Sequence, residues 1–388
     1  MRLRHPDGTV VHLSYCTNVH PAEDLDGVLS QLADFAEPVR ERLGTPRLGL
    51  GLWLARTVAT RLLDDPGALP LLRDELERRG LEVVTLNAFP YAGFHTGAPV
   101  KKSVYRPDWT ARERLEYTLD CARILAGLLP SDAVRGSVST LPLAWRTPWS
   151  PHRAERAHRH LGLLAEGLSA IRAETGRTIR VGLEPEPGCV MENVGAATAL
   201  RRHVPTDLIG LCLDACHLAT EFEDPAEACD ALAAHGVPVV KAQASCALHV
   251  DSPTTPAARV ALGRFAEERF LHQTREHAGG NHVLRADDLP DALAGALPGD
   301  GPWRVHYHVP VHAALAPPLR STQSELLATL DVLLGGQAAL TDHVDVETYT
   351  WSVLPEGPTR GELLDGIAAE LAWTRDALSS LGVKEIMS

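Results

Sequence analysis

Acidic side chains stand near the ends of three short apolar runs in this sequence. Glu184 and Glu186 belong to the first run, Asp214 and His217 to the second, and Glu347 to the third. Carboxylates that meet inside a protein repel one another and are costly to desolvate unless a cation or another partner neutralises them. Together with a neutral oxygen donor, such a set suits a divalent ion such as Mg²⁺ or Mn²⁺.

A fourth run supplies the neutral donor. Lys241 and Gln243 are two residues apart in it, so both side chains point to the same face of a strand. His217 would orient a metal ligand or contact the substrate. We therefore predict a divalent metal ion bound by Glu184, Asp214, Gln243 and Glu347.

The elements that would position these residues are strands that alternate with helices. The candidate strands are 11–20, 48–54, 82–90, 136–141, 179–187, 209–217, 239–245, 304–312 and 343–351. Repeated strand–helix units indicate a parallel α/β architecture. Neither GxGxxG after the first strand nor GxxxxGK[ST] occurs, which argues against Rossmann and P-loop folds. We predict a (β/α)8 TIM barrel, in which the active site lies at the C-terminal ends of the strands.

A closed barrel takes eight strands, and this sequence offers nine. The polar stretch 248–302 contains prolines and glycines, and we expect an insertion there, around the seventh unit. Either 304–312 or 343–351 closes the barrel. We favour 343–351, because a helix over 359–381 then completes the last unit.

Residues typical of helix N-termini support the predicted alternation of strands and helices. Ser150 before Pro151 is typical of an N-cap followed by proline at the first helical position. Three capping boxes are predicted, at Thr110 with Glu113, Thr322 with Glu325, and Thr359 with Glu362.

Composition excludes several classes of protein. The 388 residues include 37 Lys and Arg against 50 Asp and Glu, a net charge of −13, which argues against a nucleic-acid or anionic-membrane binder. No stretch approaches the roughly 18 apolar residues that span a bilayer. The 7 scattered cysteines form no CxxC pair and are expected to be reduced and buried. No long linker divides the chain, so we expect one cytoplasmic domain over 1–388.

Polar residues at other strand ends complete the expected substrate site. Asn18 and His20 end the first strand and Asn87 the third, and His95 lies on the long loop that follows. This loop also carries aromatic residues and lysines, as expected of a lid over a polyhydroxylated or phosphorylated ligand. The predicted substrate contacts are Asn18, His20, Asn87, His95, Glu186, His217, Lys241 and His308.

His308 has a second interpretation. His306, His308 and His312 share one face of the run 304–312. If that run is a barrel strand, His308 replaces Gln243 as a metal ligand. If it belongs to the insertion, these histidines lie at the surface or support the site.

The pattern Leu-Glu184-Pro, Asp214-x-x-His217, Gln243 and Glu347 resembles the xylose isomerase-like TIM barrels, including the sugar-phosphate isomerase/epimerase group and its hydroxypyruvate isomerase branch. The resemblance implies one divalent metal (Mn, Mg or Zn) bound by those four residues. It also implies that Glu184 and Glu347 are the catalytic pair that moves a proton between adjacent carbons. Lys241 stands where the epimerase branch tends to have histidine.

Longer strings resemble the metabolite traffic protein EboE family. They are Ser-Tyr-Cys-Thr-Asn-Val-His-Pro (14–21), Leu-Asn-Ala-Phe-Pro-Tyr-Ala-Gly-Phe-His (86–95), Val-Tyr-Arg-Pro-Asp-Trp (104–109), Leu-Glu-Pro-Glu-Pro (183–187) and Val-Glu-Thr-Tyr-Thr-Trp (346–351). This resemblance implies a barrel that acts in secondary metabolism on a precursor to be modified or moved. The resemblance implies a pathway but no particular reaction, so the reaction has to be inferred from the residues of the site.

Three functions follow as hypotheses. The first is a metal-dependent isomerase or epimerase acting on a small sugar-, polyol- or cyclitol-like metabolite. The second is a metabolite-binding or traffic protein on the same barrel without turnover. The third, disfavoured by the charge of −13, is an endonuclease IV-like DNA repair enzyme. A small polyhydroxylated substrate is the expected partner, with neither nucleic acid nor membrane insertion. Whether the chain forms a homodimer stays open.

Overall fold

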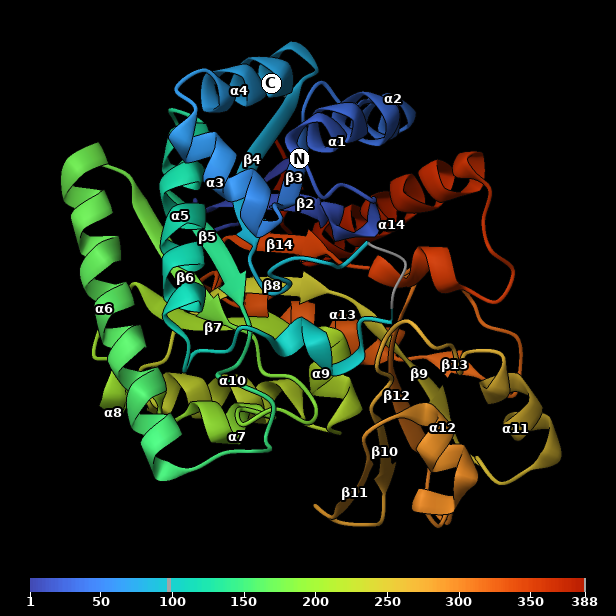
Figure 1. Ribbon diagram of the computed structural model, residues 1–388. Coiled ribbons are helices and arrows are strands. Elements are labelled where there is room, and N and C mark those ends of the chain that lie inside the picture. Colours follow the sequence, from blue (N-terminus) through green and yellow to red (C-terminus); the bar gives the residue numbers. More distant parts are fainter. Residues whose placement is uncertain (96–98, 387–388) are drawn as a thin grey trace.

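Eight parallel strands close into a barrel (Figure 1). The computed structural model describes residues 1–95 and 99–386. The last strand pairs with both the seventh and the first, which closes the barrel. The strands are β2 (Val10–Cys16), β3 (Leu48–Trp53), β4 (Leu81–Asn87), β5 (Arg135–Thr140), β6 (Thr178–Leu183), β7 (Ile209–Asp214), β8 (Val239–Ala244) and β14 (His343–Val346). The predicted TIM barrel is confirmed, and 343–346 is its closing strand.

Helices surround the barrel and bury apolar stripes against it. In α6 (Pro151–Thr175) the buried residues Leu161, Leu164, Leu168 and Ile171 recur every three or four positions. The other outer helices are α1 (Leu25–Gln31), α2 (Glu37–Leu43), α3 (Arg56–Asp64), α4 (Ala68–Arg78), α5 (Arg112–Leu128), α7 (Val194–Ala197), α8 (Leu200–His203), α9 (Ala215–Thr220), α10 (Pro225–Ala234), α13 (Gln323–Leu334) and α14 (Arg360–Ser380). Among the described residues, no helix is both long and apolar enough to cross a membrane.

A second, antiparallel sheet is inserted between β8 and β14. Its order is β11-β10-β12-β9-β13, and it lies beside the barrel at the lower right of Figure 1 with α11 (Pro256–Gly263) and α12 (Leu289–Asp291). Its strands are β9 (Cys246–Val250), β10 (Thr274–His277), β11 (Val283–Ala286), β12 (Trp303–Val309) and β13 (Arg320–Ser321). The expected insertion is therefore present and extends beyond 248–302, because the run 304–312 contributes β12 to it.

Two short strands at the ends of the chain pair beside the start of β2. β1 (Arg2–Arg4) pairs antiparallel with β2 and with β15 (Lys384–Glu385). The described ends of the chain are therefore neighbours.

Two of the three predicted capping boxes are wrong. Thr359 and Glu362 form both hydrogen bonds of a box at the start of α14, and Ser150 caps α6 as predicted. The Thr110 hydroxyl instead donates to Asp108. The Thr322 hydroxyl instead accepts from the backbone N–H of Ala247 in β9. In both places the threonine hydroxyl forms a hydrogen bond with a group outside the helix instead of capping it.

A buried ion pair joins the neighbouring strands β8 and β14 inside the barrel. Lys241 Nζ lies 2.8 Å from Asp345 Oδ2, and both side chains are fully shielded from solvent. Ser14 Oγ donates to the other Asp345 oxygen at 2.6 Å. Gly51 faces this carboxylate so closely that a Cβ there would lie 2.1 Å from Asp345 Oδ2. All seven cysteines are free and buried, as predicted.

Candidate active site

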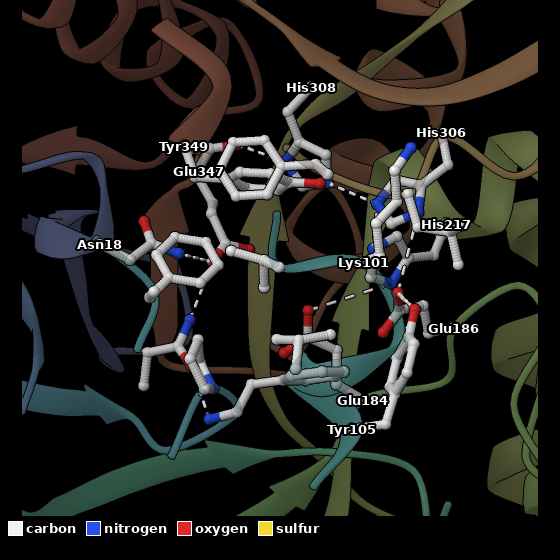
Figure 2. Close-up of a pocket in the computed structure, with 18 residues that line it drawn as sticks. Asn18, Lys101, Tyr105, Glu184, Glu186, His217, His306, His308, Glu347 and Tyr349 are labelled. Carbon is white, nitrogen blue, oxygen red and sulfur yellow. Dashed lines mark hydrogen bonds and ion pairs between the residues drawn. The ribbon is translucent and has the colours of Figure 1, made fainter. Parts of the chain in front are cut away.

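Three carboxylates from three strands meet at the C-terminal end of the barrel. Glu184 directly follows β6, Asp214 ends β7, and Glu347 directly follows β14. One oxygen of each lies within 4.8 Å of those of the other two, and all three side chains are buried. In Figure 2, Glu184 and Glu347 lie on facing sides of the centre of the site. The structure thus brings together three of the four predicted metal ligands.

Gln243, the fourth, lies beside them and has unpaired polar atoms. It is buried and pairs in register with Asp214 across β7 and β8. Within the described residues, both amide atoms of Gln243, Glu184 Oε2 and Asp214 Oδ2 have no hydrogen-bond partner. Each unpaired buried polar group costs about 1–3 kcal/mol, so native structures rarely leave several together. This buried, oxygen-rich set fits a hard or borderline divalent cation.

The electrostatics of the carboxylates support the same conclusion. Burial, and then the charges of Glu347 and Asp214, raise the pKa of Glu184 well above its usual range. Burial also raises the pKa of Glu347, although the nearby His308 and Lys241 limit the rise. Glu184 and Glu347 are therefore difficult to ionise together beside Asp214 unless a cation compensates their charges.

Two asparagines hold Glu347. The amide nitrogens of Asn18 and Asn87 each donate to Glu347 Oε1 at 2.8 Å. Asn87 Oδ1 in turn accepts from the backbone N–H of Phe89. Both residues were predicted to contact substrate, and the structure shows that their amide nitrogens orient this carboxylate.

Asp214 both caps a helix and borders the site. Its Oδ1 accepts from the backbone N–H of His217 at 3.0 Å and from Ser245 Oγ at 2.8 Å. This N-cap starts α9 and so places the His217 ring beside the carboxylates. The D-x-x-H pattern is therefore a helix cap that also positions two site residues.

Three histidine rings meet next to Asp214. His306 Nε2 lies 3.0 Å from His217 Nε2 and 3.3 Å from His308 Nε2. All three rings are buried, and burial lowers the pKa of His217 to about 4. His306 and His308 lie on β12, so the inserted sheet forms one wall of the site.

Glu186 belongs to a separate hydrogen-bonded group. The Tyr105 hydroxyl donates to Glu186 Oε1 at 2.6 Å, and Gln273 Nε2 approaches the same oxygen at 3.3 Å. Burial raises the pKa of Glu186 to about 8, partly offset by these two donors. Glu186 thus lines the cavity without joining the three carboxylates at the centre.

The loop after β4 covers the site, as expected of a lid. Its residues Phe94, Val100, Val104 and Tyr105 line the cavity with Phe89, Phe270, Leu271 and Tyr349. The remaining cavity is narrow, about 60 Å³. The roof is therefore largely apolar and the floor carries the carboxylates. Residues 96–98 of the expected lid lie outside the described residues.

Ion pairs fix this lid to the inserted sheet. Lys101 Nζ lies 2.6 Å from Asp288 Oδ2, and Lys102 Nζ lies 3.0 Å from Asp287 Oδ2. The backbone N–H groups of Val100 and Lys101 both donate to the carbonyl of Arg269. The two lysines, expected on a lid over a polyhydroxylated or phosphorylated ligand, thus bind carboxylates of the insertion.

Three predicted substrate residues do not line the cavity. His20 is buried against Tyr15 and stacks on Phe35. His95 accepts a hydrogen bond from Arg269, and Lys241 pairs with Asp345 in the barrel interior. Asn18, Asn87, Glu186, His217 and His308 do line it.

Gln273 and Phe270 were not predicted from the sequence, and His306 was predicted only as a surface residue or a residue that supports the site. His306 carried a signal, because it shares a strand face with His308. Gln273 and Phe270 lie in the insertion outside any motif, and only its folding against the barrel places them at the site.

Fold and site together define a parallel barrel with a carboxylate centre at the C-terminal ends of its strands. The model of the family described as "Xylose isomerase-like TIM barrel" matches residues 54–275. The chain belongs to this family.

Solved structures share the fold. A protein of Anabaena variabilis ATCC 29413, assigned as a sugar phosphate isomerase/epimerase, aligns over 96% of this chain and 99% of its own, with 14% identity and a TM-score of 0.52. An L-ribulose 3-epimerase aligns over 96% of both chains, with 11% identity and a TM-score of 0.51. No curated protein sequence matches this chain.

Proposed function

We propose that this chain is a metal-dependent enzyme of the isomerase or epimerase kind, acting on a small sugar-, polyol- or cyclitol-like metabolite. The resemblance to the EboE family supports a substrate of secondary metabolism. The observation that carries the proposal is the buried group Glu184, Asp214 and Glu347 beside Gln243, with unpaired oxygens on Glu184, Asp214 and Gln243.

The proposed ligands are Glu184, Asp214, Gln243 and Glu347. A divalent ion bound there would polarise a carbonyl or hydroxyl group of the substrate. Mn²⁺, Mg²⁺ and Zn²⁺ all accept carboxylate and amide oxygens.

Glu184 and Glu347 are the proposed proton-transfer pair. One carboxylate removes the proton from the carbon beside the substrate carbonyl, and the other returns a proton to the adjacent position or opposite face. Asn18 and Asn87 both bind Glu347 Oε1, so the other oxygen, Oε2, is the one that can exchange a proton. The apolar lid excludes water, which protects the transferred proton from the solvent.

A second candidate is a metabolite carrier, and the closed lid favours it. The Lys101–Asp288 and Lys102–Asp287 ion pairs hold the lid over a narrow cavity, which would retain a bound metabolite. The presence or absence of proton transfer distinguishes the enzyme from the carrier, because a carrier has no need of paired carboxylates.

Elemental analysis of protein purified without chelators tests the centre. The wild type is expected to contain bound Mn, Mg or Zn, and the Glu184→Gln, Glu347→Gln double variant is expected to lose at least one equivalent. Asp207→Asn, at an exposed surface pair, is the matched control and should keep the full content. Equal metal content in all three proteins would contradict the proposed centre.

Isotope exchange tests the reaction. Incubation with a panel of keto-pentoses, keto-hexoses and keto-cyclitols in D₂O should incorporate deuterium beside the carbonyl of at least one compound, detected by NMR. Glu347→Gln should abolish this exchange while the lid and cavity still bind the compound. Binding of a panel compound without any exchange in the metal-loaded wild type would favour the carrier.

A further inference from the structure

We propose that the cavity selects a substrate with an ammonium group, such as an amino-polyol, aminocyclitol or amino sugar, and that Glu186 binds this group. The inference rests on the proposed function for the rest of the substrate, but binding of the ammonium group itself requires no turnover. Three features of the cavity support it: a carboxylate oxygen that the described residues leave without a partner, the pairing of its lysine, and an aromatic roof.

Glu186 presents a carboxylate oxygen to the cavity. The Tyr105 hydroxyl and Gln273 Nε2 both approach Glu186 Oε1, at 2.6 and 3.3 Å. Among the described residues none donates to Glu186 Oε2, and unlike Glu184 Oε2 this atom is not completely enclosed by protein. Only 5% of the residue is exposed, and it lines the cavity, where Figure 2 shows Tyr105 reaching it. The second oxygen is therefore available to a ligand.

Other buried carboxylates show what a purely structural role requires. Glu276 accepts two hydrogen bonds at each oxygen, three from backbone N–H groups and one from the Trp303 indole. Both oxygens of Glu370 are likewise bonded. Glu186 lacks donors at its second oxygen, and the nearest charged partner among the described residues is the His306 ring, at 3.9 Å. A buried carboxylate is costly without such partners, and a ligand cation would supply one.

The described lining offers no unpaired lysine or arginine to an anionic ligand. Lys101 is the one such residue that lines the cavity, and its Nζ lies 2.6 Å from Asp288 Oδ2. Glu184, Glu186 and Glu347 line the same space, and a divalent ion would compensate only part of their charge. A phosphate on the ligand would therefore meet like charges, whereas an ammonium group would be attracted.

The roof of the cavity is aromatic, which also favours a cation. The ring centroids of Phe94, Phe270 and Tyr349 lie 5.0, 5.2 and 5.9 Å apart. Phe89 and Tyr105 add a second pair of rings to the lining. The electron-rich faces of such rings attract ammonium groups, most strongly where water is excluded. A carboxylate combined with aromatic rings is therefore suited to binding an amine.

Glu186 lies outside the group of three carboxylates but lines the same cavity. A ligand held at Glu186 by its ammonium group would extend towards Glu184 and Glu347. The amino group would thus orient the rest of the substrate without occupying the place of the metal. Because the cavity measures about 60 Å³, small amines fit best beneath the closed lid.

Calorimetric titration of the metal-loaded full chain with matched compounds tests the selection. Each set contains an amine, the corresponding alcohol and a phosphate: serinol, glycerol and glycerol 2-phosphate; glucosamine, glucose and glucose 6-phosphate; scyllo-inosamine, scyllo-inositol and its phosphate. We expect at least one amine to bind at least about tenfold more tightly than its alcohol and its phosphate. Amines that bind no better than their alcohols or phosphates in every set, or that do not bind at all, would overturn the proposal.

Glu186→Gln removes the charge and keeps the shape of the side chain. The variant should reduce the preference for the amine over the alcohol to below about threefold. Its metal content, which shows whether the centre has folded, should equal that of the wild type. Asp207→Asn, which removes an exposed carboxylate, is the matched control and should keep the full preference. A Glu186→Gln variant that keeps the full preference would overturn the proposal.

A measurement on the wild type alone guards against a misfolded variant. Nuclear Overhauser effects should connect the ligand protons beside the amino group with phenylalanine or tyrosine ring protons, and their absence would also overturn the proposal. Isotope exchange separates this inference from the proposed function. An amine that binds with the expected preference but exchanges no deuterium supports the selection and favours the carrier. Exchange confined to neutral or phosphorylated ketones supports the enzyme and refutes the selection.

Discussion

Replacing Lys241 by methionine should destabilise the barrel strongly. Lys241 and Asp345 lie 2.8 Å apart with no exposed side-chain surface, so the change leaves the Asp345 charge buried with Ser14 as its remaining polar contact. Breaking a fully buried pair from one side costs about 3–5 kcal/mol, a large share of the 5–15 kcal/mol that stabilises a typical domain. Removing both charges, in Lys241→Met with Asp345→Asn, should restore most of this loss, because no unpaired charge then remains.

Guanidinium unfolding followed by circular dichroism measures these differences. A chelator should be present throughout, so that metal binding does not contribute to stability. Lys102→Met, which breaks an ion pair with a half-exposed lysine, is the control and should cost no more than about 1 kcal/mol. The reasoning is refuted if Lys241→Met costs no more than this control, or if the double variant is as unstable as the sum of the two single variants.

Two further predictions concern the same barrel. Gly51→Ala should destabilise the barrel by about 1–3 kcal/mol, because the new Cβ would lie 2.1 Å from Asp345 Oδ2. Lys241 and Ser14 hold this carboxylate in place. An unchanged midpoint of guanidinium unfolding would contradict this prediction. Burial opposes the charge of Asp342, but His343, Arg180 and Arg135 outweigh it and hold the pKa of Asp342 well below its ordinary value of 3.8. Its contribution to stability is therefore complete above pH 3.8 and is lost as the pH falls from there towards the lower pKa of the folded state. Asp342→Asn should therefore flatten the fall of the melting temperature between about pH 4 and pH 2. An equally steep fall in both proteins would count against the ion pairs.

The strands of the barrel could be predicted from sequence because each is a short apolar run followed by a helix. The same signal could not distinguish 304–312 from a barrel strand. In β12, alternate side chains such as Val305 and Tyr307 are buried just as they would be in the barrel. The hydrophobic pattern of a segment indicates that a strand is buried but does not indicate which sheet the strand joins.

The residues of the site likewise fall into those that could be predicted from the sequence and those that could not. Glu184, Asp214 and Glu347 could be placed together because parallel strands end at one face of a barrel. That Asn18 and Asn87 bind Glu347 depends on side chains crossing between β2, β4 and β14, which spacing along the chain does not encode. Asn18 lies inside a 3-10 turn, Thr17–Val19, and His20 directly follows this turn and stacks on Phe35 instead of lining the cavity.

The position of β14 also sets the order in which a nascent chain can fold. Seven strands are complete at Ala244, but the eighth begins at His343, after the entire inserted sheet. Until then β2 and β8 have unpaired edges, which are sites of aggregation in incomplete sheets. Glu347 follows the same strand, so a growing chain has neither a closed barrel nor a full set of carboxylates before that point. Closure of the fold and assembly of the three carboxylates are therefore a single late step of synthesis.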